Sequence, residues 1–174
     1  DDNFDIGFAI GGSNFTVNAV ELAAAHAVIM NGGQYIEPHC VSRIEFKNGT
    51  PTYTANYTGQ QVLSPQAAYL TSELMYDAVN GPYYNYMQIL KRDYPVYGKT
   101  GTTDWGTDGL QYNIPQGAAK DKWMISETSQ YTTAVWVGYE KGVKDQDTYF
   151  SSAKSQLNLP GNISSLILSS LTDS

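Results

Sequence analysis

Cysteine is almost absent from this 174-residue sequence, which contains only Cys40. A single cysteine excludes an internal disulfide, and without a second thiol it also excludes a cysteine-based zinc site. We expect Cys40 to be a small, partly buried apolar side chain. No apolar run approaches the ~18 residues that a membrane-spanning helix needs, so the sequence predicts no transmembrane segment and no membrane contact.

Basic residues are also scarce, with 10 Lys and Arg against 17 Asp and Glu and a formal net charge of −7. The cations are spread along the chain, which argues against a nucleic-acid partner, and the acidity argues against an anionic membrane surface. There is no signal peptide and no initiator Met, which suits a processed product. At 41% hydrophobic and 16% charged, the composition is typical of a globular domain.

The segment from 18 to 30 carries the signals of an amphipathic helix. Asn18 can cap its N-terminus, and Glu21 completes a capping box. Apolar residues then recur at helical spacing, so we expect them to form a buried face: Val20, Ala23, Ala24, Ala27 and Val28. Asn31-Gly32-Gly33 ends the helix, because glycine readily adopts the left-handed conformation found there.

A hairpin and a second helix follow. Tyr35 to Phe46 and Thr50 to Tyr57 read as two strands around the turn signal Asn48-Gly49. The helix begins at Ser64-Pro65 and ends at Gly81-Pro82. We expect its buried face to consist of the apolar residues at helical spacing, which are Ala67, Leu70, Leu74 and Ala78.

The second half of the chain reads mainly as strands. Residues 83–93 are aromatic and ambiguous, 96–103 predict a strand, and 104–120 a long loop. Two strands at 121–128 and 131–140 are joined by a short turn, and a Ser-rich tail at 141–174 holds a final helix at 162–171. Short connections imply antiparallel pairing, so the expected fold is mixed α/β, with an antiparallel sheet flanked by helices.

One motif carries chemistry: Lys99-Thr100-Gly101, followed by Thr102 and Thr103 on the strand predicted at 96–103. As a tripeptide it is weak evidence, because chance places such a match in many sequences. Its value depends on what else occurs around it and in what order.

Several further motifs accompany it in a fixed order: Val20-Glu21-Leu22-Ala23, Asn31 to Pro38, Ser64-Pro65, Gly98 to Thr103, Asp121-Lys122-Trp123 and Ala134 to Tyr139. This order resembles the C-terminal half of the transpeptidase domain of class A penicillin-binding proteins. The resemblance runs from about Ile10 to Glu140, and residues 1–174 are then one C-terminal portion of a penicillin-binding transpeptidase, β-lactamase-like fold. Ser126, where the family often has Gly, and the long loop after Thr103 depart from the pattern.

The resemblance implies roles for five residues. Lys99 would supply positive charge toward the substrate carboxylate and the reacting serine, and the hydroxyls of Thr100 and Thr102 would bind that carboxylate. Gly101 would clear space for the substrate backbone, and the N–H of Thr102 would form half of an oxyanion hole. Thr103 would extend the substrate-binding strand. Peptidoglycan stem peptides and β-lactams are the implied ligands, with no cofactor and no metal.

The expected nucleophile does not precede Lys99. The family uses Ser-x-x-Lys and Ser-x-Asn upstream of Lys-Thr-Gly, and neither occurs there. Ser151-Ser152-Ala153-Lys154 fits the first pattern, but it lies downstream on a tail that we expect to be poorly structured. We therefore expect a chain that is inactive alone and that completes a serine D,D-transpeptidase with the missing N-terminal half of the domain. The parent would be extracytoplasmic, at the bacterial cell surface and membrane-anchored.

Alternatives remain beside this interpretation. The chain could be a non-catalytic module that binds peptidoglycan peptides or penicillin, or an unrelated cell-surface structural domain. Trp123 and Trp136 are more typical of core aromatics than of a ligand platform. His26 and His39 lack a third metal ligand at sensible spacing, and Asp104 and Asp108 are better read as solvated loop acids than as calcium ligands.

Overall fold

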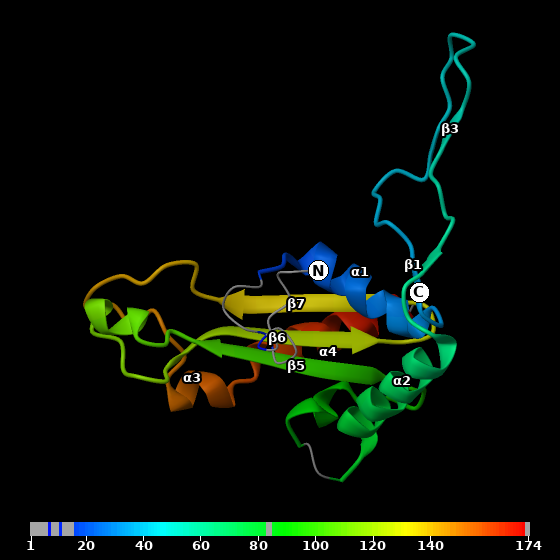
Figure 1. The fold of residues 1–174 in the computed structure, drawn as a ribbon. Coiled ribbons are helices and arrows are strands. Elements are labelled where there is room, and N and C mark those ends of the chain that lie inside the picture. The colour runs from blue at the N-terminus through cyan, green and yellow to red at the C-terminus, as the bar shows by residue number, and fades with distance from the viewer. Residues whose placement is uncertain (1–6, 8–10, 12–15, 83–84, 173–174) are drawn as a thin grey trace.

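The computed structural model describes residues 7, 11, 16–82 and 85–172, so the start of the resemblance at Ile10 lies outside it. Its centre is an antiparallel sheet in the order β5-β6-β7, formed by Tyr97–Asp104, Ala119–Glu127 and Thr132–Gly138. Helices pack on both of its faces (Figure 1). The mixed α/β fold and the three strands predicted from the sequence are confirmed.

The two faces of the sheet carry different neighbours, because successive side chains of a strand point to opposite sides. Helix α1 (Ala19–Met30) covers the side that carries Glu127, since its His26 contacts that carboxyl group. Helix α4 (Leu159–Thr172) covers the opposite side through Leu168, which packs with Met124. We call these two sides the α1 face and the α4 face.

Helix α1 begins as the sequence predicts. The Asn18 side chain accepts the N–H of Glu21, and the Glu21 carboxylate accepts the N–H of Asn18, which completes the capping box. Asn31 caps the C-terminus, and Gly33 follows with a φ of +91°. The predicted buried face is only partly correct: Val28 is buried, but Val20 is 61% exposed.

Helix α2 (Pro65–Asn80) is capped by Ser64 as expected, but a different stripe of the helix is buried. The buried residues are Ala68, Ser72, Met75 and Val79. The predicted stripe is wrong for Ala67, Leu70 and Leu74, which are exposed, Leu74 by 74%, while Ala78 is half-buried. Both stripes are rich in apolar residues, so the hydrophobic period located the helix but not the side that meets the sheet.

Residues between the two helices form an arm that projects from the body (Figure 1). At its base β1 (Gln34–Tyr35) pairs with β4 (Gln60–Gln61), and further out β2 (Arg43–Ile44) pairs with β3 (Tyr53–Thr54). The hairpin is confirmed, although its strands are much shorter than predicted. Little covers the arm, and its larger apolar side chains are exposed: Val41, Ile44, Phe46, Tyr53 and Tyr57.

Cys40 lies on this arm and is exposed, which corrects the expectation of a partly buried side chain. A cysteine side chain is buried only where the fold brings a hydrophobic core close to it. Here the polypeptide leaves the body at Gln34 and returns at Gln61, so Cys40 has no core to enter.

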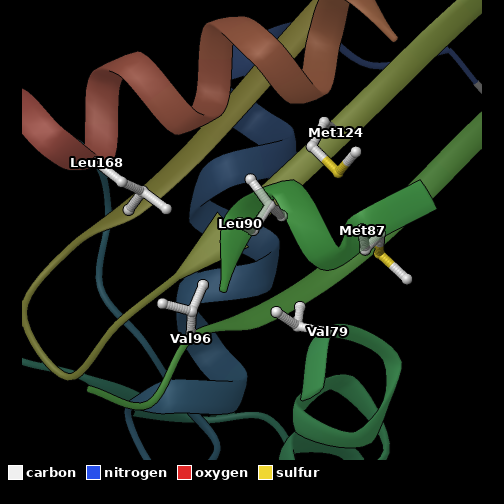
Figure 2. Close-up of a cluster of buried hydrophobic side chains, with 6 residues drawn as sticks. All are labelled: Val79, Met87, Leu90, Val96, Met124 and Leu168. Atoms are coloured by element: carbon white, nitrogen blue, oxygen red, sulfur yellow. The ribbon is translucent and has the colours of Figure 1, made fainter. Parts of the chain in front are cut away.

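The main hydrophobic core lies on the α4 face and joins four elements. Figure 2 shows its six buried side chains, from α2, the 3₁₀ helix η2 (Asn85–Leu90), β6, α4 and the segment before β5: Val79, Met87, Leu90, Val96, Met124 and Leu168. The ambiguous aromatic segment is therefore a short helix that contributes to the core. Arg92, just after η2, fastens α4 to it by donating to the Ser165 carbonyl and hydroxyl oxygens at 2.8 and 2.9 Å.

The tail after β7 is more ordered than predicted. It contains the short helix α3 (Ser152–Gln156) and then α4, which confirms the predicted final helix. The Lys154 ammonium donates to the Tyr139 hydroxyl and to the Asp147 and Tyr149 carbonyls. Ser151 caps α3 by accepting the N–H of Lys154. The downstream Ser-x-x-Lys therefore closes a loop against the sheet and has a structural explanation.

Truncation of a core leucine should be far more costly than truncation of an exposed one. Leu90→Ala removes a side chain that is fully buried, whereas Leu74→Ala removes one that is 74% exposed. We expect a loss of about 2–5 kcal/mol for the first variant and less than about 0.5 kcal/mol for the second. Urea unfolding of both variants beside the wild-type chain measures this, and equal midpoints would contradict the described core.

Candidate active site

The Lys-Thr-Gly run lies on β5, the edge strand of the three-stranded sheet. One edge of β5 pairs with β6 over the whole run, from Lys99 opposite Ile125 to Thr103 opposite Asp121. No strand of the described chain pairs with the other edge. Such an edge presents backbone N–H and C=O groups that can receive an extended peptide as an additional strand.

Strand alternation divides the five predicted site residues between the two faces. Lys99, Gly101 and Thr103 share the α1 face with Trp123 and Glu127, whereas Thr100 and Thr102 lie on the α4 face. A peptide bound at the free edge would therefore run between the two rows, with the Lys99 ammonium on one side and two threonine hydroxyls on the other. The structure brings all five residues to one edge.

Lys99 is the exposed cation of this edge, and its Nζ donates to the Thr100 carbonyl at 2.6 Å. Thr102 is exposed as well. Thr103 is also exposed, and its hydroxyl donates a hydrogen bond to the Asp121 carboxylate at 2.6 Å. The other oxygen of Asp121 accepts the indole N–H of Trp136 at 3.0 Å, so this carboxylate ties together all three strands.

Gly101 has a local structural reason to lack a side chain. A Cβ at this position would lie 3.2 Å from the Cβ of Trp123, which is tighter than most real Cβ contacts. A larger residue would press against the indole on the α1 face. This constraint comes from within the chain and adds to the expectation that Gly101 clears space for a substrate backbone.

The α1 face is only partly covered. The rings of Trp123 and Trp136 lie 6.4 Å apart on it, and Trp136 is 41% exposed. This corrects the prediction of a core role for Trp136. The contacts of α1 along this face are instead with the other end of the strands, where His26 meets Glu127 and where Ala134 and α1 line a common groove.

Sequence reasoning missed one pair of titratable residues at this end. Glu127, at the end of β6, has a fully buried side chain, and its Oε1 lies 3.6 Å from Nδ1 of His26. Neither carboxyl oxygen has a hydrogen-bond partner within the described ranges. Burial raises the pKa of Glu127 to about 8, and burial together with the nearby Lys99 charge lowers the pKa of His26. The signal in the sequence was an acidic residue at a core-facing position of a strand.

The other residues weighed as ligands do not assemble a site. His39 contacts the Glu37 carbonyl on the arm, and Asp104 and Asp108 are exposed. Among the residues that the structure describes, no three His, Cys, Asp or Glu side chains come together as a metal site would require.

Most of the chain is similar in sequence to known proteins. The family model described as the penicillin binding protein transpeptidase domain matches residues 2–158. Penicillin-binding protein 1A/1B of Bacillus subtilis (strain 168) is 34% identical over 140 residues, which are 79% of this chain and 15% of that protein. Penicillin-binding protein 1A of Clostridium acetobutylicum is also 34% identical over 140 residues, 78% of this chain and 14% of the relative. The chain thus spans only a small part of these relatives.

Solved structures agree in fold. The penicillin-binding protein PonA1 from Mycobacterium tuberculosis matches with a TM-score of 0.60 and 27% identity, over 83% of this chain and 37% of that one. Penicillin-binding protein A of the same organism matches with a TM-score of 0.61 at 22% identity, over 91% and 35% respectively, which supports the fold alone. With its antiparallel sheet flanked by helices and a family-model match over most of its length, the chain belongs to the penicillin-binding protein transpeptidase family.

Proposed function

We propose that this chain is the part of a serine D,D-transpeptidase that supplies the Lys-Thr-Gly strand. The parent enzyme would cross-link peptidoglycan stem peptides through an acyl-enzyme and would bind penicillin. The observation that carries the proposal is the position of Lys99 to Thr103 on the free edge of β5. The same five residues in the interior of the sheet could not receive a peptide.

The roles that the family resemblance implies are compatible with the geometry of the edge. The stem peptide pairs with β5, and its terminal carboxylate meets the Lys99 charge and the hydroxyls of Thr100 and Thr102. A serine of the preceding half attacks the penultimate carbonyl, and the oxyanion accepts hydrogen bonds from the N–H of Thr102 and of that serine. The terminal D-alanine leaves, and an amine of a second stem peptide then takes the acyl group.

The preceding half of the domain is the proposed physical partner. Large apolar side chains are left exposed on α1, α2 and the α1 face, namely Val20, Tyr69, Leu70, Leu74 and Trp136. Extended exposed apolar surface of this kind marks an interaction site in a soluble domain. We propose that the preceding half covers part of it and brings its serine to β5.

The parent would act outside the cytoplasm, at the cell surface, where peptidoglycan is assembled, and it would be anchored to the membrane. None of the helices in the described part of the chain combines the length and apolar character needed to cross a bilayer. An anchor would therefore come from another part of the parent protein.

A second candidate is a binding module without catalysis. It is favoured by one observation, the absence of Ser-x-x-Lys before Lys99 in this sequence. Such a module would hold peptidoglycan peptides or penicillin on β5 without forming an acyl-enzyme. The two candidates differ in whether a penicillin becomes covalently attached to the complete domain.

Penicillin should acylate the complete domain but not this chain alone, because covalent catalysis needs the serine nucleophile. Intact-mass analysis after exposure to a penicillin, with this chain alone and co-expressed with its natural upstream segment, tests this. We expect the penicilloyl mass on the upstream segment only. An adduct on the isolated chain would contradict the proposed division, and no adduct on either folded piece would favour the non-catalytic module.

Lys99→Ala in the complete domain should slow penicillin acylation by about 10²-fold or more, since it removes the charge that meets the carboxylate. Lys47→Ala, at an exposed lysine on the arm, is the matched control and should leave the rate unchanged. The acylation rate with a fluorescent penicillin provides the measurement. Equal rates for the two variants would exclude Lys99 from the site.

Leu74→Asp should weaken association between this chain and the co-expressed upstream segment, because it places a charge in the proposed contact. Leu166→Asp changes a leucine of similar exposure, 72% against 74%, on α4 instead of α2. We expect co-purification to fall at least about tenfold for the first variant and to be unaffected by the second. Loss in both or in neither would show that α2 is not the contact.

A further inference from the structure

The buried pair of His26 and Glu127 has no role in the proposed reaction. It joins α1 to the end of β6, with a separation of 3.6 Å between Nδ1 and Oε1. The Glu127 side chain has no exposure and that of His26 has 18%, and neither Nδ1 nor the two carboxyl oxygens has a hydrogen-bond partner in the described part of the chain. A buried polar cluster without partners is costly unless its own atoms satisfy each other.

One shared proton satisfies this pair. The 3.6 Å separation is longer than a hydrogen bond, so the two side chains need to approach by a further few tenths of an ångström. A protonated Glu127 can then donate its O–H to an unprotonated Nδ1 of His26. An ionised Glu127 beside a neutral His26 would instead be a buried and uncompensated negative charge, and two protons would create a buried imidazolium. The neutral pair is therefore the form that the site favours near neutral pH.

Register places Glu127 beside Lys99 on the α1 face. Glu127 is opposite Tyr97, and Lys99 is the next residue of β5 on the same face, so Glu127 and Lys99 are diagonal neighbours. Diagonal Cβ atoms of an antiparallel pair lie about 7–8 Å apart, within reach of a lysine side chain. The Lys99 charge also acts on His26, where it adds to the effect of burial in lowering the pKa of the imidazole.

We propose that His26 and Glu127 share a single proton and, as a neutral pair, are positioning residues for Lys99. While the pair is neutral, Glu127 presents no negative charge on the α1 face to attract the ammonium, and Lys99 stays at the free edge. When Glu127 ionises, its carboxylate draws the ammonium toward the end of β6 and away from the bound carboxylate. The effect on acylation rests on the proposed function, whereas the shared proton does not.

The groups that face Glu127 are few. From α1 it contacts His26, and on β5 its opposite residue is Tyr97 and its diagonal neighbour is Lys99, while its opposite residue on β7 is the uncharged Thr132. Burial, with smaller contributions from acidic groups on α2, raises the pKa of Tyr97, so that phenol stays neutral in the range considered. Lys99 is therefore the cation available to an ionised Glu127.

The direction of the pH dependence follows from the two shifts. The pKa of Glu127 is raised from 4.5 to about 8 in the folded chain, so its contribution to stability is present at low pH and is lost as pH rises through about 8. The pKa of His26 is lowered from 6.5, so its contribution is present above 6.5 and is lost as pH falls below that value. Because the carboxyl group of the unfolded chain ionises near 4.5, the contribution of Glu127 decreases across the range from 4.5 to about 8, so the combined contribution of the pair falls as pH rises above 6.5.

The first experiment measures the rate of penicillin acylation of the complete domain between pH 6 and 10. We expect the wild-type rate to fall severalfold above about pH 8, as Glu127 ionises. Glu127→Gln cannot ionise, so it should keep the neutral-pH rate and lose this decline. Glu45→Gln, at an arm carboxylate that is 68% exposed, is the matched control and should retain the wild-type profile. Identical profiles for wild type and Glu127→Gln would overturn the positioning role.

The second experiment detects the proton on Glu127 and does not depend on a chemical reaction. Infrared difference spectra of the complete domain should show the carbonyl stretch of a buried carboxylic acid at pH 7, absent in Glu127→Gln and lost from wild type as pH rises through about 8. Absence of this band at pH 7 would overturn the shared proton, even if acylation occurs. If the domain shows this band but forms no penicillin adduct, the proposed function is wrong, whereas the proton shared by His26 and Glu127 remains supported.

His26 variants provide a test if Glu127→Gln fails to fold. His26→Asn places an amide oxygen near the position of Nδ1, so it can still accept the Glu127 proton, and the acid band and neutral-pH rate should persist. His26→Leu removes the acceptor and should shift the band to higher frequency, as expected for a carboxylic acid without a hydrogen bond. An unchanged band in His26→Leu would show that His26 does not share the proton.

Discussion

The structure depends on one constraint: β5 must be held firmly along one edge while its other edge stays free. The ladder with β6 meets the first requirement, because every residue from Tyr97 to Thr103 has an opposite residue. The core on the α4 face supports this ladder from behind through Met124, and Asp121 links it across all three strands. The free edge is what makes a Lys-Thr-Gly run useful for recognition, since a strand paired on both sides could accept no peptide.

The two faces of the sheet have different surroundings. The α4 face is packed by large apolar side chains and is closed by α4, which Arg92 fastens to η2. The α1 face carries the polar and aromatic groups near Lys99 and is covered mainly at one end. The buried apolar core therefore lies on the α4 face, whereas Lys99 and its aromatic neighbours lie on the α1 face, and Thr100 and Thr102 lie on the α4 face.

Local signals in the sequence predicted local structure well. The capping box at Asn18 and the Ser64-Pro65 start of α2 involve residues only three or four positions apart, so their outcome did not depend on the rest of the fold. The order of motifs around Lys99 identified the family, and the strand predicted at 96–103 corresponds to β5. Residues whose environment is set by distant segments were harder: Leu74 and Trp136 are exposed although their apolar character suggested burial. The pair of His26 and Glu127 joins α1 to β6, and only the folded chain reveals it.

The projecting arm has a consequence for how related chains can diverge. It is joined to the body by two short strands at its base, and its outer ladder contributes no side chain to the buried cluster. The entropic cost of closing a loop grows slowly, by about 0.6 kcal/mol for each doubling of length. Insertions and deletions between Gln34 and Gln61 should therefore have little effect on the stability of the core. The length of this arm can then change during evolution while the sheet that carries Lys99 keeps its structure.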